Sequence, residues 1–113
     1  MDKSVACGPE TAAGSRMAEA ANQWCVYLIR CADDTFYCGI SNRPALRWAA
    51  HCAGQAARYT RSRGVKEMRL LSVGLSRSAA GREEWRIKQL NRQQKQLLWA
   101  AVVETDRIWR QEA

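Results

Sequence analysis

The chain has 113 residues, which is enough for one domain with its own hydrophobic core and too few for two of ordinary size. With 47% hydrophobic and 26% charged residues it has the composition of a globular protein, which excludes a largely disordered chain. Its formal net charge of +7 favours a polyanionic partner, nucleic acid ahead of an anionic membrane surface, although a solvated basic surface explains the charge equally well.

The sequence contains neither a membrane segment nor a secretion signal. No apolar run approaches the roughly 18 residues of a membrane span, and the N-terminus lacks the hydrophobic stretch of a signal peptide. Five cysteines occur without a Cys-x-x-Cys spacing and with a single histidine, so a structural zinc site is not expected. We therefore expect a cytoplasmic protein without a small-molecule cofactor, in which most cysteines are small buried residues.

Composition and charge divide the chain into tails and a domain. Residues 1–22 are rich in Ala, Gly, Ser and acids and lack sustained apolar periodicity, which predicts a flexible N-terminal tail. Residues 43–95 hold thirteen Lys and Arg against three acids. The basic field thus belongs to the domain, expected at residues 23–103, and residues 104–113 are expected to form a C-terminal tail or a helix extension.

A β-hairpin is predicted at the start of the domain. The runs WCVYLIRC (24–31) and TFYCGIS (35–41) are rich in β-branched and aromatic residues and flank a short turn. Side chains alternate across a strand, so Tyr27 shares a face with Ile29, and Tyr37 shares a face with Gly39. A short turn in normal register puts both tyrosines on the same side, whereas a slip of one residue reverses this.

The segment NRPALRWAAHCAGQ (42–55) predicts a helix. Asn42 or Arg43 can cap it, Pro44 suits its first turn, and Gly54 ends it. Arg47 and His51 are four residues apart and so share one helical face. The apolar side of the helix is predicted from Leu46, Ala49 and Ala50.

The second half of the domain begins with a predicted basic loop, QAARYTRSRGVKEMR (55–69), followed by a short third strand, MRLLSV (68–73). Ser76 or Ser78 can cap a helix running to about Leu90, in which Gly81 is a weak point. Asn91 with Gln94 predicts the capping pair of a last helix reaching Val103. The expected fold is therefore α+β, a small three-stranded antiparallel sheet flanked by helices.

One stripe of the longer C-terminal helix contains a charge where packing residues are expected. Ala80, Glu84, Ile87 and Asn91 recur at helical spacing, which predicts an inward face. A glutamate there is unexpected for a helix that only packs.

Taken together, five segments in this order resemble the GIY-YIG nuclease superfamily, in particular its small stand-alone, single-domain bacterial group, often called YhbQ-like. The resemblance covers roughly residues 24–99. Two positions depart from the family motif, since Cys25 replaces its first glycine and Cys38 its isoleucine; both suit packed strand positions. The segments are VYL (26–28), YCG (37–39), ALRWAAH (45–51), AGQAARYTRSRG (53–64) and REEWRIKQLNR (82–92).

The resemblance implies a metal-dependent endonuclease that hydrolyses phosphodiester bonds in DNA, with RNA as a further possible substrate, in DNA repair or processing. It assigns the metal, Mg²⁺ or Mn²⁺, to Glu84, with the neighbouring Glu83 as the alternative. The implied catalytic residues are Tyr27, Tyr37, Arg47, His51 and Glu84, and the implied nucleic-acid-binding residues are Arg58, Tyr59, Arg61, Arg63 and Lys66.

The residue types suit this chemistry. A carboxylate is a hard oxygen ligand for Mg²⁺ or Mn²⁺, and an arginine fork can hold a phosphate oxygen. A tyrosine whose pKa is lowered by a nearby arginine and metal can accept a proton from the attacking water, and the sequence leaves open whether Tyr27 or Tyr37 does so. His51 either relays a proton or only orients a tyrosine. Gly39 is expected to let a phosphate or a helix approach the strand closely.

Taken singly, the same residues have structural explanations. Strand tyrosines commonly pack with a solvated hydroxyl, and Glu84 has basic neighbours for a surface ion pair. The five tryptophans are predicted to be core residues rather than base-stacking surfaces. The alternative function is a catalytically weak or inactive nucleic-acid-binding module on the same fold. Neither the natural substrate nor the oligomeric state follows from the sequence.

Overall fold

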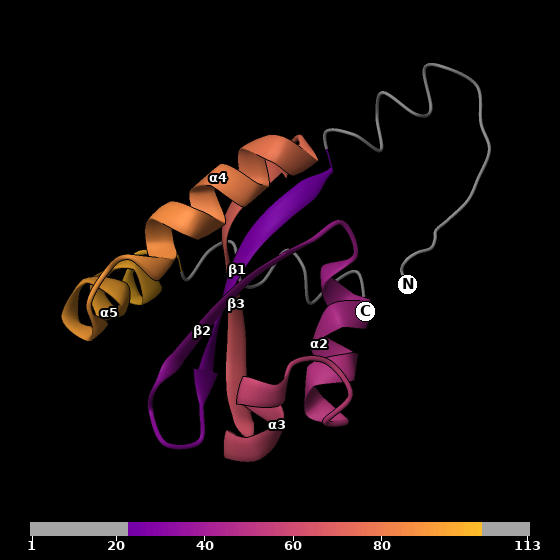
Figure 1. Cartoon of the computed structure of the whole chain (residues 1–113), viewed down its shortest axis with the longest axis vertical. Helices are drawn as coiled ribbons and strands as arrows, with labels where there is room; N and C mark the ends of the chain where they lie inside the picture. Colours follow the sequence, from indigo (N-terminus) through magenta and orange to yellow (C-terminus); the bar gives the residue numbers. More distant parts are fainter. Residues whose placement is uncertain (1–22, 103–113) are drawn as a thin grey trace.

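The computed structural model describes residues 23–102. Its centre is a three-stranded antiparallel sheet with helices on both faces (Figure 1), which confirms the predicted α+β fold. The predicted tails, residues 1–22 and 104–113, lie outside the described part of the chain. No helix within residues 23–102 is long and apolar enough to cross a membrane.

The sheet consists of β1 (Trp24–Cys31), β2 (Phe36–Ser41) and β3 (Val65–Leu75), in the order β2-β1-β3. In the hairpin of β1 and β2, Tyr27 lies opposite Gly39 and Tyr37 lies opposite Ile29. Directly opposed residues of an antiparallel pair share a face, so both tyrosines point to the same side. The predicted register is confirmed.

β1 is the central strand and is buried on both faces, each covered by a different pair of helices. Its first face, with Tyr27 and Ile29, packs with Met68 of β3. Partly buried residues of α2 (Pro44–Cys52) and α3 (Arg58–Arg63) cover that cluster. Its second face, with Val26 and Leu28, packs under α4 (Arg77–Lys88) and α5 (Arg92–Ala100). The domain is thus a sheet between two helical layers, visible on either side of β1 in Figure 1.

The prediction of a loop over residues 55–69 is wrong. Residues 58–63 form the short helix α3, and β3 begins at Val65, directly after Gly64 with φ of +77°. β3 is the longest strand of the sheet rather than a short one. Its pairing with β1 shifts register between Arg30 and Cys31, which interrupts the alternation of apolar and polar residues by which strands are predicted.

The predicted apolar side of α2 is also wrong. Leu46 is 59% exposed and Ala49 is exposed. The face toward the sheet instead holds Ala45, Trp48 and the buried His51. The two largest rings of the helix lie three residues apart, on one side, and their burial orients it.

At the start of α2 the structure selects Arg43 of the two predicted caps. Arg43 is its N-cap residue and makes no capping hydrogen bond with its side chain. Ser41 Oγ instead accepts a hydrogen bond from the backbone N–H of Arg43, at 2.9 Å.

Both predicted C-terminal helices are confirmed. Ser76 is the N-cap residue of α4 and accepts from Ala79 N–H, and α4 continues unbroken past Gly81. Asn91 and Gln94 form a complete capping box on α5, which ends at Ala100 rather than at Val103.

The predicted inward face of α4 is confirmed for Ala80 and Ile87, which are buried. Glu84 is half-buried, and Asn91, beyond the end of α4, is exposed. The prediction of core tryptophans holds for Trp99 but is wrong for Trp85, which is 68% exposed. Of the cysteines in the described residues, Cys25, Cys31 and Cys38 are buried and Cys52 is exposed.

Candidate active site

A chain of hydrogen bonds links Tyr27 of β1, His51 of α2 and Thr60 of α3. The Thr60 hydroxyl donates to the Ala57 carbonyl at 3.1 Å, so its oxygen is free to accept from His51 Nδ1–H at 2.8 Å. The other ring nitrogen, Nε2, then carries a lone pair and accepts from the Tyr27 hydroxyl at 3.0 Å. The fold thereby fixes both the tautomer of His51 and the direction of the Tyr27 O–H bond.

The protonation states of Tyr27 and His51 follow from their burial. Burial, and next the charge of Arg47, lower the pKa of His51 from 6.5 to about 4, so the imidazole is neutral at pH 7. Burial raises the pKa of Tyr27, and a hydrogen bond from the Arg47 side chain only partly opposes it. The expected lowering of a tyrosine pKa is therefore wrong for Tyr27. It is a neutral donor that is hydrogen-bonded to His51.

The ring of Tyr27 lies across the strand β2 because residue 39 has no side chain. A Cβ atom placed on Gly39 would overlap the Tyr27 hydroxyl and the ring carbon that bears it. The glycine was expected to leave room for a phosphate or a helix. The structure fills that room with Tyr27 itself, so Gly39 sets the position of the hydroxyl.

Tyr37 and Tyr59 extend the aromatic cluster toward the surface. The ring centroid of Tyr37 lies 5.5 Å from that of His51 and 5.9 Å from that of Tyr59. The guanidinium of Arg63 lies 3.9 Å from the centroid of the Tyr59 ring. Tyr59 is therefore packed between Tyr37 and Arg63 rather than presented as an open stacking surface.

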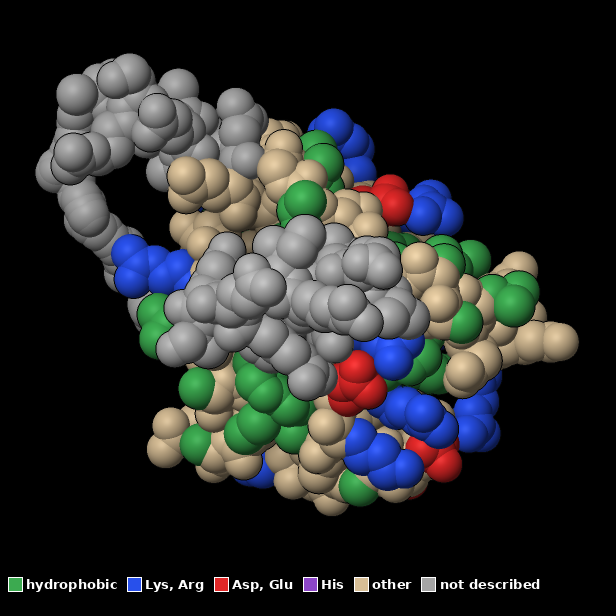
Figure 2. Space-filling model, turned by 180° about the vertical axis from the view of Figure 1, so that it is seen from behind, with side chains coloured by type: hydrophobic (Ala, Val, Ile, Leu, Met, Phe, Trp, Pro, Cys, Tyr) green, Lys and Arg blue, Asp and Glu red, His purple; other side chains and the backbone are tan. Residues whose placement is uncertain are grey.

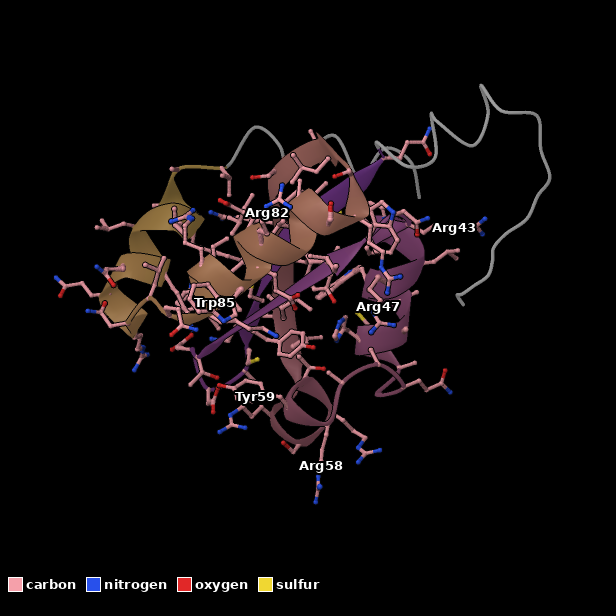
Figure 3. All side chains as sticks on the ribbon, turned by 45° about the horizontal axis from the view of Figure 1, so that its top comes forward. Arg43, Arg47, Arg58, Tyr59, Arg82 and Trp85 are labelled. Atoms are coloured by element: carbon pink, nitrogen blue, oxygen red, sulfur yellow. The ribbon has the colours of Figure 1, made fainter. Side chains whose placement is uncertain are left out.

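Arg47 joins this cluster from α2. Its side chain contacts Tyr27, and no acidic side chain among residues 23–102 forms an ion pair with it. Figure 3 shows it on the α2 side of the molecule, across the sheet from Trp85 of α4. A guanidinium at the cluster without a carboxylate partner can bind a phosphate oxygen.

Glu84 lies on the other side of the edge strand β2, on α4. Its Oε2 is 3.0 Å from Lys88 Nζ, which in turn lies 5.9 Å from the Tyr37 ring centroid. Burial, and next the charge of Glu84, raise the pKa of Cys38 to about 12. Since Cys38 precedes Gly39 on the opposite face of β2, the carboxylate and the tyrosines flank the same strand.

Glu83, the alternative acid, forms its ion pair with Arg86 one turn along the same helix.

The chemistry of Glu84 fits a divalent cation of the Mg²⁺ type. No group of three or more His, Cys, Asp or Glu that could enclose a metal occurs in residues 23–102. Mg²⁺ does not need such a cage, because it keeps several waters and takes one or two carboxylates together with substrate phosphate. The Lys88 ammonium pairs with this carboxylate at 3.0 Å, so a metal ion would have to share or displace it.

The residues predicted to bind nucleic acid fall into two groups. Arg58 and Arg61 are exposed and form no ion pair with any acid in the described chain. Arg63 pairs with Asp33 at 3.1 Å, and Lys66 pairs with Asp34 at 2.8 Å, so both tie the hairpin turn to its neighbours. On the back of the molecule the visible basic side chains lie in several places, some beside acidic ones (Figure 2).

Sequence reasoning missed one polar residue of the cluster, Thr60, whereas the ion pair expected between Glu84 and a basic neighbour is confirmed, with Lys88 as the partner. Thr60 lies within YTRSRG, where only its nine-residue spacing from His51 hints at a contact. Lys88 follows Glu84 by one helical turn, a spacing typical of helical ion pairs.

The order of the hairpin tyrosines, Arg47, His51 and Glu84 along the chain resembles that of the GIY-YIG nuclease class, and the comparison with known families shows this class directly. The family model described as the GIY-YIG catalytic domain matches residues 23–97, so the chain belongs to this family. Its relatives are small UPF0213 proteins, which are the stand-alone members of the family.

Two of these relatives show the extent of the similarity. A UPF0213 protein of Neisseria meningitidis serogroup A is 44% identical over 79 residues, covering 70% of this chain and 87% of the relative. One from Vibrio cholerae is 39% identical over 93 residues, covering 81% and 92% respectively. No solved structure matches the chain significantly.

Proposed function

We propose that this protein is a metal-dependent endonuclease that hydrolyses phosphodiester bonds in DNA, in DNA repair or processing. The observation that carries the proposal is the hydrogen-bonded pair of Tyr27 and His51 beside Arg47, a guanidinium without a described carboxylate partner. The net charge of +7 supports a polyanionic substrate, with RNA as a second possibility.

Tyr27 and His51 act together as the base in the proposed mechanism. The Tyr27 oxygen accepts a proton from the attacking water while the Tyr27 proton passes to His51 Nε2, over the existing 3.0 Å hydrogen bond. Thr60 continues to accept from Nδ1–H and keeps the ring oriented. Arg47 binds a phosphate oxygen and stabilises the negative charge of the transition state. Tyr37 packs on His51 and keeps the pair in place.

Glu84 is the proposed metal ligand. A bound Mg²⁺ or Mn²⁺ would supply charge neutralisation at the phosphate and at the leaving oxygen. Lys88 shares the carboxylate in the free protein, and its exposed ammonium can turn toward the substrate phosphate.

Cleavage by Glu84→Gln, with Glu83→Gln as the matched control, tests the proposal. The full chain is incubated with labelled duplex, single-stranded and branched DNA and with RNA, in Mg²⁺, Mn²⁺ or EDTA. We expect Glu84→Gln to lose cleavage by a factor of about 10²–10³ while still binding, because a charge-stabilising group is removed. Glu83→Gln should cleave like the wild type.

Two outcomes would contradict the proposal: equal cleavage by Glu84→Gln and the wild type, or no cleavage of any substrate by the wild type. The second outcome, with binding retained, would favour a nucleic-acid-binding module. The ion pair between Lys88 and Glu84 is the observation that supports that alternative, since it neutralises the one carboxylate at the site.

A further inference from the structure

A cavity of about 360 Å³ opens beside Arg47, where β1 begins and β2 ends. Its size lies within the range of small-molecule sites, roughly 300–1,000 Å³. Four segments meet there: the first residue of β1, the end of β2, the first turns of α2 and the start of α4. The residues that matter here are Trp24, Ile40, Arg43, Leu46, Arg47 and Arg77.

The polar half of this cavity is basic. Arg43, Arg47 and Arg77 line it, and no acidic residue among residues 23–102 does. Every ion pair between side chains of residues 23–102 involves other basic residues, so no described carboxylate neutralises these three. The first turns of α2 and α4 also contain no acid. Three uncompensated guanidinium groups around one hollow favour an anion.

The other half of the cavity is apolar. Leu46 projects from α2 with 59% of its surface exposed, and the half-buried Trp24 lines the opposite strand. The guanidinium of Arg77 lies 5.3 Å from the centroid of a Trp24 ring. A flat aromatic surface flanked by cations suits a ligand that joins a planar ring to a phosphate, as a nucleotide does.

Arg47 connects the cavity to the proposed reaction centre. Its side chain lines the cavity and also contacts Tyr27. A nucleic-acid strand that binds Arg47 through a phosphate therefore has this hollow directly beside it. Figure 3 shows Arg43 and Arg47 at α2, with Arg43 farther from the sheet.

We propose that this cavity is a subsite for the nucleotide that adjoins the cleaved phosphodiester bond. Arg43 and Arg77 bind the phosphate on the far side of that nucleotide, and Trp24 with Leu46 contacts its base or sugar. The subsite rests on the proposed nuclease function and adds to it the binding of a neighbouring nucleotide, which positions the strand before cleavage.

The test is the binding of thymidine 3′,5′-bisphosphate, which carries a phosphate on each side of one nucleoside, to the full chain in EDTA. Binding is followed by NMR at the indole N–H of Trp24, assigned by its loss in Trp24→Phe. The variant is Leu46→Glu, which places a carboxylate in the cavity, and the matched control is Leu97→Glu, a leucine on α5 that is 68% exposed. Both sites are exposed, so both variants are expected to fold.

We expect the bisphosphate to shift the Trp24 signal, and Leu46→Glu to weaken its binding about tenfold or more through repulsion of the phosphates. Leu97→Glu should bind like the wild type. Arg77→Gln should also weaken binding, whereas Arg92→Gln, on the distant α5, should not. Thymidine or inorganic phosphate at the same concentration should bind more weakly than the bisphosphate.

Four results would overturn the subsite: no shift at Trp24, equal binding by Leu46→Glu, equal binding by Arg77→Gln, or inorganic phosphate binding as tightly as the bisphosphate. Because the assay needs neither metal nor cleavage, it separates the two proposals. A wild type that cleaves DNA but shows one of these results loses the subsite alone. A wild type that binds the bisphosphate here but cleaves nothing contradicts the nuclease proposal and leaves the cavity as a nucleotide-binding site without a cleavage role.

Discussion

Gly39 determines where the Tyr27 hydroxyl lies, because any side chain at residue 39 would overlap it. We expect Gly39→Ala to destabilise the fold by about 1–3 kcal/mol, as overpacking does, and to abolish cleavage by displacing the Tyr27 ring from His51. Denaturant unfolding and the DNA cleavage assay measure the two effects.

Gly81→Ala is the control, since a Cβ there would meet nothing within 4 Å beyond its chain neighbours and the backbone of its own helix, α4. That substitution should stabilise the protein by about 0.5–1 kcal/mol. If Gly39→Ala were as stable and active as the wild type, the close contact would not control Tyr27.

His51 should make the protein less stable in mild acid. Its folded-state pKa of about 4 is below the value of 6.5 for an unperturbed histidine. Between these values the unfolded chain binds a proton that the folded chain does not, so the free energy of unfolding falls as the pH drops from 6.5 toward 4. Above 6.5 both states are neutral and this contribution is fully present.

Urea unfolding of the wild type and of His51→Gln at pH 7 and pH 4.5 measures this effect. The loss of stability on acidification should be smaller in His51→Gln, because the carboxylates are common to both proteins. An equal loss in the two proteins would show that His51 does not titrate across this range.

The sequence pattern was sufficient to place the two tyrosines on one face of the hairpin, and Arg47 and His51 on one face of a helix, because register and helical spacing are local properties. It could not predict the part played by Thr60 or the direction of the Tyr27 pKa. Both depend on how α3 packs against α2 and on how deeply the tyrosine is buried, and neither quantity is encoded in spacing.

Among the elements, α5 depends on its capping box. Asn91 and Gln94 accept hydrogen bonds from backbone N–H groups at its start. Trp99, near its end, packs in the hydrophobic cluster between the sheet and the helices α4 and α5. Asn91→Ala should therefore lower the free energy of unfolding by about 0.5–2 kcal/mol. Gln93→Ala, in the same turn and exposed, should change it by less than about 0.5 kcal/mol. Thermal unfolding compares them, and similar melting temperatures for the two variants would mean that the cap does not hold the helix.

The elements predicted well from sequence are those whose ends carry local signals, as α4 does at Ser76 and α5 at Asn91. α3 has no side-chain cap, and β3 follows it with only Gly64 between them. These two elements form because tertiary contacts with β1 and α2 hold them, and such contacts are absent from a local pattern.

At the scale of the whole molecule, ion pairing decides which basic residues can meet a phosphate. Arg58 and Arg61 have no described acidic partner, whereas Arg63 and Lys66 already neutralise the hairpin turn. The logarithm of the DNA-binding constant falls linearly with the logarithm of the salt concentration. Replacing Arg58 and Arg61 by Gln should make this fall less steep, by about 0.9 for each duplex phosphate that the protein no longer neutralises. Replacing Arg63 and Lys66 by Gln should reduce the steepness of this salt dependence less.

Fluorescence anisotropy with labelled DNA at salt concentrations from about 50 to about 200 mM measures the difference, because affinity falls steeply over this range for a protein that neutralises several phosphates. Equal slopes for the two double variants would mean that the ion pairs open when DNA binds.

The burial of β1 on both faces has a consequence for how this site fails. Its backbone is hydrogen-bonded to a strand on either side, and Tyr27 lies in its middle. Amides of such a strand exchange with solvent only when the whole domain opens. The backbone that carries Tyr27 should therefore open only with the fold, and we expect heat inactivation to coincide with unfolding.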